Sequence, residues 1–567
     1  MEYSENGSQI GAVMTFVPAI GESDFRKLRL LGAGYVDKTD FIGQVLSDLS
    51  PVLLFPRPRR FGKTINLSSL AYFLRKTDEN LTPLFEGLKV SRDAAAMAHF
   101  QKYPTIFITF KDVKATTFDK VLEGIGTRVA ELYREHQYLL DDAGLGRSMT
   151  MRLEKVLQGA PSQRDLEDSL WVLSTALYEH HKTRVVILID EYDTPIQSGY
   201  VNGYFDDVVL FFRNFLSAAL KDNSALYKGV LTGILRVAKE NMFSGLNNIV
   251  VHSLVSNEYA TSFGFTEDEV ASIVPVDRLA EVRAWYNGYV FGGQVIYNPW
   301  SILNYIKKGT LEPYWVNTSS NDLIEHLATK QGLGLSALSA ALLNGETIHV
   351  LIDDNIVLRD IDRQRDALWN FLLFSGYLKL AKLTLREGRY RGDLAIPNKE
   401  IYLVYENMFG NWLHQAAAGN ALVDELVQAL INGNAPKVQK LFESLLLSAM
   451  SFQDPAGRQP EKLYHGFILG LLVHLESTYE VRSNRESGYG RADVLMRPKI
   501  PGQPGIVMEL KVLHRGDTPE EALAEAAEQI RERQYAAELR NAGVHIVHEY
   551  TLLFDGKQAW VRRVEAQ

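Results

Sequence analysis

The chain has 567 residues, 46% of them hydrophobic, and no cysteine, so several soluble domains can each bury a core, while disulfides and thiolate metal sites are excluded. Its formal net charge of −9 repels nucleic acid, so a nucleic-acid partner needs a local basic surface. No apolar run approaches the roughly 18 residues of a membrane span and the first residues lack a secretory signal pattern, from which we expect a cytoplasmic protein.

A phosphate-binding loop is the first pattern that predicts chemistry. Residues 57–64 read RPRRFGKT and lie between a short apolar run, residues 53–55, and a segment with apolar residues at helical spacing, residues 65–75. Strand, loop and helix in this order are the context in which backbone amides, a lysine and a hydroxyl hold the phosphates of ATP and its Mg²⁺. The loop therefore predicts a nucleotide site in an α/β domain with a parallel sheet.

The two halves of this loop differ. Gly62, Lys63 and Thr64 fit the pattern G-x-x-x-x-G-K-[ST], whereas Arg57 occupies the position of the first glycine. Because a left-handed conformation costs a non-glycine residue about 1–2 kcal/mol, we expect the loop to take a different path there. We also expect the basic residues of the loop to serve phosphate. The nucleotide-binding candidates in the loop are Arg59, Arg60, Phe61, Gly62, Lys63 and Thr64, and Thr64 is also a candidate Mg²⁺ ligand.

A continuous apolar run that ends in two carboxylates lies at residues 185–191, VVILIDE, as in a buried parallel strand. At the carboxyl edge of such a sheet, Asp190 can hold a Mg²⁺-bound water, and Glu191 can orient or deprotonate the attacking water. Alone, the pattern is equally typical of a buried strand with ordinary acidic residues at its end. Together with the loop, it favours an ATPase with Asp190 as a metal ligand and Glu191 as a catalytic residue.

A third strand, residues 229–235, carries Thr232 near its end and is followed by Arg236. In a P-loop ATPase, such a threonine can sense the γ-phosphate and such an arginine can stabilise transferring charge. A turn-capping threonine and a surface arginine are the alternative, and both interpretations stay open. P-loop ATPases often complete their sites between subunits, so in a homo-oligomer Arg236 or Arg60 can act across an interface.

These motifs resemble a known family. The residues YVDKT (35–39), RPRRFGKT (57–64), LIDEYDTPI (188–196) and LTGILRVAKENMFSGLNN (231–248) are similar to those of bacterial AAA-ATPase-like proteins. Members of that family commonly carry a PD-(D/E)XK nuclease-like domain at the carboxyl terminus. The resemblance implies ATP binding, and it implies that the arginine at position 57 is the family's usual residue.

The middle of the chain, residues 263–398, changes to helices and short strands. Aromatic turns at residues 286–289 and 297–300 are more typical of core packing than of a ligand site. Residues 378–396 alternate apolar and polar side chains around Glu387–Gly388, which predicts a β-hairpin. Such a basic hairpin is either a wing that contacts nucleic-acid phosphates or an exposed, solubilising edge. Its basic residues are Lys382, Arg386, Arg389 and Arg391.

The last region has a readable order of elements. Apolar spacing and turn residues predict a helix, three strands, a helix that Thr518 caps, and a further strand. This is the core order of PD-(D/E)XK nucleases. The predicted elements are residues 461–475, 479–486, 491–496, 505–512, 519–540 and 544–554.

Three charged residues of this region predict phosphodiester hydrolysis. Asp493 lies on the second strand, and Glu509 and Lys511 lie two residues apart on the third, so that both point to one face. The two carboxylates suit Mg²⁺ or Mn²⁺, and Lys511 can orient the attacking water or stabilise the developing charge. A simple salt-bridged pair on a sheet face is the alternative for Glu509 and Lys511. Glu461, on the first helix, can supply a further carboxylate for the metal.

The nuclease resemblance adds Gln529 and Tyr535, which match polar residues that position substrate or metal waters. From all these patterns we expect an α/β protein with three regions: a P-loop AAA-like ATPase (1–262), a mostly helical, winged-helix-like middle region (263–455) and a nuclease-like domain (456–567). The predicted function is an ATPase joined to a metal-dependent nuclease that acts on nucleic acid. The alternatives are a nucleotide-gated binding protein without nuclease turnover, and a scaffold in which neither site operates.

Overall fold

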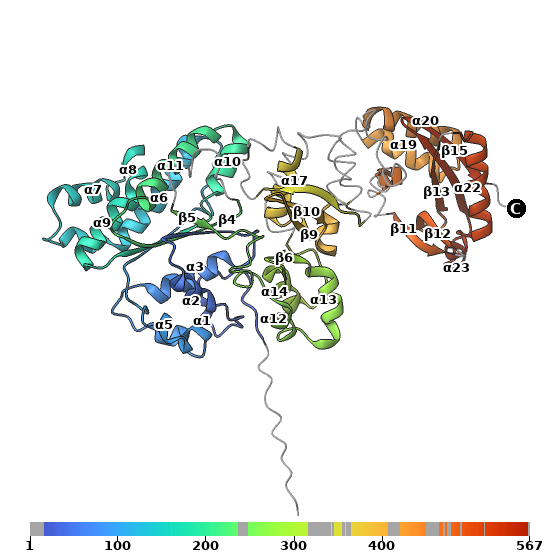
Figure 1. Ribbon diagram of the computed structural model, residues 1–567. Coiled ribbons are helices and arrows are strands. Elements are labelled where there is room, and N and C mark those ends of the chain that lie inside the picture. Colours follow the sequence, from blue (N-terminus) through green and yellow to red (C-terminus); the bar gives the residue numbers. More distant parts are fainter. Residues whose placement is uncertain are drawn as a thin grey trace, which may run out of the picture. The chain divides into compact units, whose positions relative to one another are not determined.

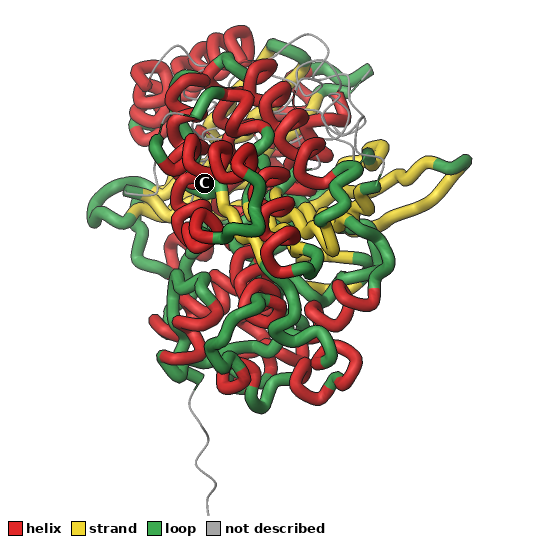
Figure 2. The backbone as a smooth tube through the Cα atoms, turned by 90° about the vertical axis from the view of Figure 1, so that its left-hand side faces the viewer, coloured by secondary structure: helices red, strands yellow, loops and turns green. Residues whose placement is uncertain are grey.

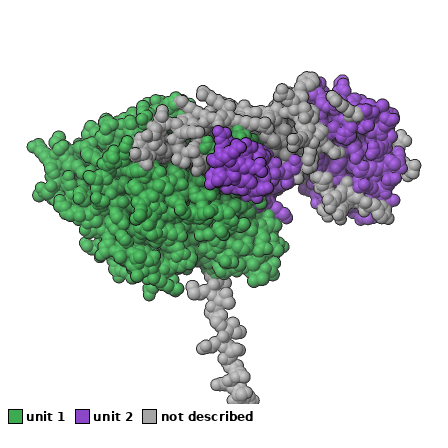
Figure 3. All heavy atoms as spheres, viewed as in Figure 1, with its two compact units in different colours: residues 1–318, 352–379 green, residues 319–351, 380–567 purple. Residues whose placement is uncertain are grey.

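The chain forms two compact units (Figure 3), residues 1–318 with 352–379 and residues 319–351 with 380–567. The predicted middle region is thus shared between the units, and the boundaries at 262 and 455 stay predictions. The computed structural model describes residues 16–159, 161–235, 248–315, 342, 345–353, 358, 365–405, 420–449, 464–465, 467–468, 471–472, 478–487, 490–514 and 516–564.

A five-stranded parallel sheet in the order β2-β3-β4-β1-β5 forms the centre of the first unit. β1 and β3 are buried along their whole length, as their unbroken apolar runs require. The predicted parallel α/β sheet is therefore confirmed. Its strands are β1 (Val52–Pro56), β2 (Thr105–Thr109), β3 (Val185–Asp190), β4 (Leu226–Gly233) and β5 (Ile249–Val251).

Helices cover both faces of this sheet (Figure 1). The helix predicted after the phosphate loop is α3 (Lys63–Leu74), which lies with α1 and α2 on one face, while α9 and α11 lie on the other. In the view turned by 90°, helices lie above and below the strands (Figure 2). The other helices here are α1 (Phe25–Leu30), α2 (Asp40–Ser47), α4 (Thr82–Phe85), α5 (Ala94–Met97), α6 (Phe118–Glu135), α7 (Arg147–Leu157), α8 (Gln163–Glu167), α9 (Ser169–His181), α10 (Thr194–Asn202) and α11 (Phe205–Leu220).

An aromatic subcore follows the sheet. The tyrosines of the two predicted aromatic turns, Tyr286, Tyr289 and Tyr297, are at most 2% exposed. This confirms packing as their role. The elements of this part are α12 (Glu267–Ala271), α13 (Leu279–Tyr286), β6 (Tyr289–Phe291), β7 (Gln294–Ile296), α14 (Pro299–Lys308) and α17 (Arg365–Ser375).

The predicted basic hairpin is present. β9 (Lys379–Arg386) and β10 (Arg389–Ala395) join at Glu387 and Gly388, and β8 (Ile348–Ile352) pairs with β10 in a three-stranded sheet. Both turn residues have positive φ, 51° and 72°, as a two-residue hairpin turn demands.

The carboxyl-terminal domain contains a mixed sheet in the order β11-β12-β13-β14-β15, in which only β13 and β14 run parallel. The helix expected over 519–540 is divided, because Gln534 adopts a left-handed conformation that ends its first part. The strand β15 was not predicted. The elements are α19 (Asn420–Ile431), α20 (Ala435–Ala449), β11 (Tyr479–Ser487), β12 (Gly490–Pro498), β13 (Gly505–Val512), α22 (Pro519–Arg533), α23 (Ala537–Asn541), β14 (Val547–Asp555) and β15 (Gln558–Val564).

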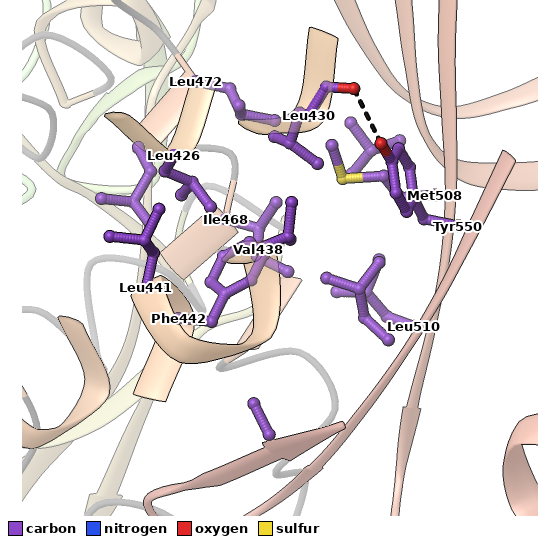
Figure 4. Close-up of a cluster of buried hydrophobic side chains, with 14 of the residues drawn as sticks. Leu426, Leu430, Val438, Leu441, Phe442, Ile468, Leu472, Met508, Leu510 and Tyr550 are labelled. Carbon is purple, nitrogen blue, oxygen red and sulfur yellow. Dashed lines mark hydrogen bonds between the residues drawn. The ribbon is translucent and has the colours of Figure 1, made fainter. Parts of the chain in front are cut away.

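The core of this domain lies between one face of the sheet and α19 and α20 (Figure 4). Met508, Leu510 and Tyr550 point into it from β13 and β14, and the Tyr550 hydroxyl donates to the Leu430 carbonyl at 2.7 Å. Since side chains alternate along a strand, Glu509 and Lys511 must lie on the opposite face, as predicted. Across the ranges described above, no helix is long and apolar enough to cross a membrane.

Candidate active sites

The phosphate loop avoids a left-handed arginine at position 57. Within the loop only Arg60 and Gly62 have positive φ, 67° and 83°, and Gly62 is the residue from which α3 begins. The expected change of loop path at Arg57 is therefore present.

The Arg57 side chain is directed into the core, contrary to the expectation that the basic residues of the loop serve phosphate. Its side chain is fully buried, and its Nη1 donates to the carbonyls of Pro56 (2.9 Å) and His252 (2.6 Å), with a longer contact from Nη2 to Tyr259. Burial lowers the pKa of this guanidinium to about 9. Arg57 is thus an internal brace between the loop and the segment after β5.

Lys63 lies beneath the loop with only 4% of its surface exposed. Its Nζ donates to the carbonyls of Arg57 (3.1 Å) and Pro58 (2.9 Å). Burial lowers the pKa of Lys63, and the nearby Glu191 and Asp190 oppose that shift. Because an ammonium group has three protons, these two bonds leave a third for a phosphate oxygen.

The other candidates of the loop divide into two groups. Arg59 Nη2 donates to Gln197 Oε1 at 3.2 Å, and the Arg60 guanidinium lies 4.0 Å from the ring centroid of Trp300. Both arginines keep part of their surface at the solvent. Phe61 is fully buried between aromatic rings of β6, so its side chain packs in the core, and a nucleotide contact through its backbone stays a prediction.

Asp190 is the polar centre of the site. It is fully buried at the end of β3 and accepts from the hydroxyls of Thr64 (2.8 Å), Thr109 (3.2 Å) and Thr232 (2.6 Å). Burial and then the charge of Glu191 raise the pKa of Asp190, whereas the bonds from Thr232 and Thr64 lower it. Thr232 therefore orients this carboxylate, its sensing of the γ-phosphate stays a prediction, and Thr109 joins the site without having been predicted.

Glu191 follows Asp190 with a positive φ of 49°. A non-glycine residue in this region costs about 1–3 kcal/mol and is characteristic of functional sites. The conformation turns the chain sharply between β3 and α10, and Thr194 Oγ1 donates to Glu191 Oε2 at 3.4 Å. Glu191 is thus half-buried, whereas the neighbouring Asp190 is fully buried.

Asp193 and Gln197 were not predicted. The Asp193 carboxylate, 1% exposed, accepts from the backbone amides of Ile234 (2.9 Å) and Leu235 (3.0 Å), and from Gln197 Nε2 (2.9 Å). Since Gln197 also bonds Arg59, these residues link the phosphate loop to the end of β4. Arg236, the predicted charge-stabilising arginine, lies outside the described residues.

The second candidate site is on the face of the mixed sheet that α22 covers. The pairing of β12 with β13 includes Val494 opposite Met508, so Asp493 and Glu509 lie at neighbouring positions on the opposite face. Asp493 Oδ2 accepts from the Leu510 amide at 2.8 Å. Lys511 Nζ is 3.9 Å from Glu509 Oε1, at the edge of an ion pair, and Glu509 is 3% exposed.

Of the two predicted positioning residues, Gln529 contacts the Glu509 carboxylate and Tyr535 contacts Gln529. Gln529 Nε2 donates to Glu509 Oε1 and lies 3.1 Å from the Tyr535 hydroxyl. His465 Nε2 is 2.9 Å from the Asp493 carbonyl, a contact that was not predicted. Glu461 lies outside the described residues. The structure thus brings Asp493, Glu509 and Lys511 together with the two polar residues that the resemblance supplied.

Both sites offer oxygen ligands for a hard cation. The donors are Thr64 and Asp190 in the first unit and Asp493 and Glu509 in the second. In the described part of the chain, no three His, Asp or Glu side chains are grouped to hold a metal by themselves. Mg²⁺ keeps several waters and commonly binds through one or two carboxylates, so each donor set fits this ion.

The parallel sheet with its phosphate loop and buried Asp190 defines a P-loop ATPase fold, and the mixed sheet with its paired carboxylates defines a nuclease-like fold. Comparison with protein families agrees: the family described as "Predicted AAA-ATPase" matches residues 19–243, and the PD-(D/E)XK nuclease superfamily matches residues 459–564. The chain therefore combines an AAA-ATPase-like domain with a carboxyl-terminal domain of the PD-(D/E)XK nuclease superfamily.

Two individual proteins are similar to this chain. An uncharacterized protein in the vnfD 5′ region of Azotobacter chroococcum mcd 1 is 27% identical over 526 residues, which cover 90% of this chain and 92% of that protein. The Walker-type ATPase PABY2304 of Pyrococcus abyssi is 13% identical, with 65% of this chain and 94% of that chain covered and a TM-score of 0.33. The similarity to the first protein extends over both domains.

Proposed function

We propose that the chain binds and hydrolyses ATP in its first unit and cleaves phosphodiester bonds of nucleic acid in its second. The observation that carries the proposal is that the carboxylate at the centre of each site is buried and oriented by neutral donors, Asp190 by three hydroxyls and Glu509 by the amide of Gln529. Burial of a carboxylate is costly, and a bound cation offsets that cost.

In the ATP site each residue has a distinct task. Lys63 donates to a phosphate oxygen, and Thr64 and Asp190 hold Mg²⁺. Glu191 orients the attacking water or accepts its proton. When bound, the ion neutralises part of the phosphate charge. Arg59 and Arg60 are the arginines of the loop with solvent access, and we assign them contacts to the nucleotide.

In the nuclease site Asp493 and Glu509 hold Mg²⁺ or Mn²⁺, which when bound offsets the charge that builds on the scissile phosphate. Lys511, whose side chain is 30% exposed, donates to the attacking water or to a phosphate oxygen. Gln529 and Tyr535 fix the orientation of Glu509. Outer contacts of this kind tune the affinity of a site for its metal.

The test measures both activities in one preparation. DNA and RNA are incubated with Mg²⁺ or Mn²⁺, with and without ATP, and released phosphate is measured in parallel. We expect Asp493→Asn and Lys511→Ala to abolish cleavage, and Lys63→Ala and Glu191→Gln to abolish ATP hydrolysis. Cleavage that persists in both nuclease variants would come from a contaminant and would refute the nuclease assignment.

The alternative is a nucleotide-gated binding protein without turnover. ATP binding that Lys63→Ala abolishes, with neither phosphate release nor cleavage in the wild-type chain, would select it. The brace at Arg57 favours this alternative, because its bonds tie the loop to the segment after β5. A cytoplasmic location and a homo-oligomeric state, in which Arg60 or Arg236 completes a neighbour's site, belong to the same proposal.

A further inference from the structure

The hairpin of β9 and β10 separates its side chains by charge. Its two-residue turn at Glu387 and Gly388 sets Arg386 opposite Arg389, and the bond from Thr384 Oγ1 to the Arg391 carbonyl, at 3.3 Å, agrees with this register. Because side chains alternate along each strand, four of the five cations of the hairpin fall on one face, and only Lys379, at the start of β9, falls on the other. The basic face consists of Lys382, Arg386, Arg389 and Arg391.

All four cations of the basic face are exposed. Arg386 and Arg389 are directly opposite each other at the tip, and like charges in this position destabilise a strand pair. The acidic side chain of the same face, Asp393, bonds His349 at 2.7 Å. In the described part of the chain, none of the four cations has an ion pair. The hairpin therefore maintains an uncompensated positive charge in a chain whose net charge is −9.

The opposite face shows that the outer half of the hairpin projects into solvent. Leu385 is 61% exposed, Tyr390 44% and Leu383 37%, whereas Leu394 near the base is fully buried. A solubilising edge typically uses lysine for this purpose. Here three of the four cations are arginines, whose planar guanidinium groups bind phosphate in a bidentate manner. The composition favours a phosphate ligand over simple protection of an edge.

We propose that the basic face binds the phosphate backbone of the nucleic acid that the nuclease domain cleaves. The inference rests on the proposed function for the identity of the ligand, because the nuclease site needs a polyanion that the overall charge repels. The occupant is a nucleic acid, whose regularly spaced phosphates match cations presented along a strand pair.

The test uses the full chain carrying Asp493→Asn, in EDTA, so that binding is measured without cleavage. Anisotropy of a labelled duplex and a labelled single strand is followed over a series of salt concentrations. The variant replaces all four cations of the basic face by glutamine. We expect its affinity to fall roughly ten- to a thousandfold, and its log–log salt slope to fall by about 3–4 for the duplex, since each phosphate contact contributes about 0.9.

A matched control removes the same charge elsewhere in the second unit, by glutamine at Lys399, Lys437, Lys440 and Lys499, which are exposed as well. We expect it to bind almost as tightly as the parent chain. The single variants Arg386→Gln and Arg389→Gln, each expected to lower the slope by about 1, keep the test decisive if the fourfold variant does not fold. Replacement of the three arginines by lysine is expected to retain most of the salt slope.

Two results would overturn the inference. One is an unchanged salt slope in the fourfold and single variants, which would leave the hairpin as an edge of the sheet. The other is competition by polyglutamate as strong as that by nucleic acid, which would identify an acidic protein as the partner. If the Asp493→Asn chain binds nucleic acid but the wild type does not cleave it, the nuclease activity is refuted and binding by the basic face is not. Failure of the proposed function and failure of this inference are therefore distinguishable.

Discussion

Because the Thr232 hydroxyl is bonded to Asp190, its removal should affect ATP hydrolysis through that carboxylate. The hydroxyl donates to Asp190 Oδ1 at 2.6 Å, and both side chains are fully buried. Thr232→Val keeps the shape of the side chain and removes this donor. A hydrogen bond to a charged group contributes about 1.5–3 kcal/mol, so we expect metal-dependent hydrolysis to fall roughly 10- to 150-fold. Thr232→Ser retains the hydroxyl and should stay near the wild-type rate.

The pH profile of hydrolysis separates this role from sensing of the γ-phosphate. The Thr232 bond lowers the pKa of Asp190, which burial and Glu191 raise, so removing the hydroxyl raises that pKa further. Because we propose that the ionised carboxylate holds the metal, we expect the variant to lose activity at a higher pH than the wild type as the pH falls. Rates are measured over a pH series at graded Mg²⁺. A lower rate with an unmoved acidic limb and an unmoved Mg²⁺ requirement would refute the reasoning.

Three further variants test the two sites and the loop. The pKa of Asp190 is raised in the folded chain, so its charged form destabilises the fold above the unfolded pKa of 3.8. Asp190→Asn should therefore abolish hydrolysis yet raise the Tm at neutral pH, by about 2–4 °C per kcal/mol. Calorimetry over a pH series should show this gain in Tm vanishing as the pH falls to 3.8. Gln529→Leu removes the amide that orients Glu509 and should lower metal affinity and cleavage about 10- to 100-fold. Equal metal affinities of the wild type and the variant in a metal titration would contradict the role assigned to Gln529. Arg57→Gly restores the glycine of the general loop pattern but leaves the carbonyls of Pro56 and His252 without their hydrogen bonds from Arg57. Each lost bond costs about 1–3 kcal/mol, and removal of a buried charge offsets part of this cost. We therefore expect the free energy of unfolding, measured with denaturant, to fall by about 2–4 kcal/mol, with no gain in hydrolysis.

Patterns confined to one strand and its turn were predictable from the sequence. The apolar run before Asp190 and the alternation around Glu509 and Lys511 specify which residues are buried and which share a face, without reference to the rest of the fold. The strand β15 also had a signal, since the dipeptide Asp555-Gly556 is typical of hairpins and precedes alternating residues, and the turn forms at Gly556 and Lys557.

The partners of side chains were not predictable in the same way, because they depend on which strands are neighbours. Thr232 reaches Asp190 only because β4 lies between β3 and β1, an order that the sequence does not state. The same placement brings Asp193 to the amides at the end of β4. Arg57 illustrates the limit most clearly: the motif identifies it as part of a phosphate loop, whereas its guanidinium is directed into the core toward the carbonyl of His252.

In both sites a buried carboxylate is oriented by neutral hydrogen-bond donors. A carboxylate that is to hold a cation must be fixed in direction while keeping its charge, and a bonded lysine or arginine would supply the direction but cancel the charge. Asp190 is oriented by hydroxyls and Glu509 by an amide, both neutral donors, while Lys511 stays at 3.9 Å from Glu509. The negative potential that the proposed metal requires is therefore retained at both sites. Moving a full cation closer, as Gln529→Lys would, should cost metal affinity even though Glu509 would be held more firmly.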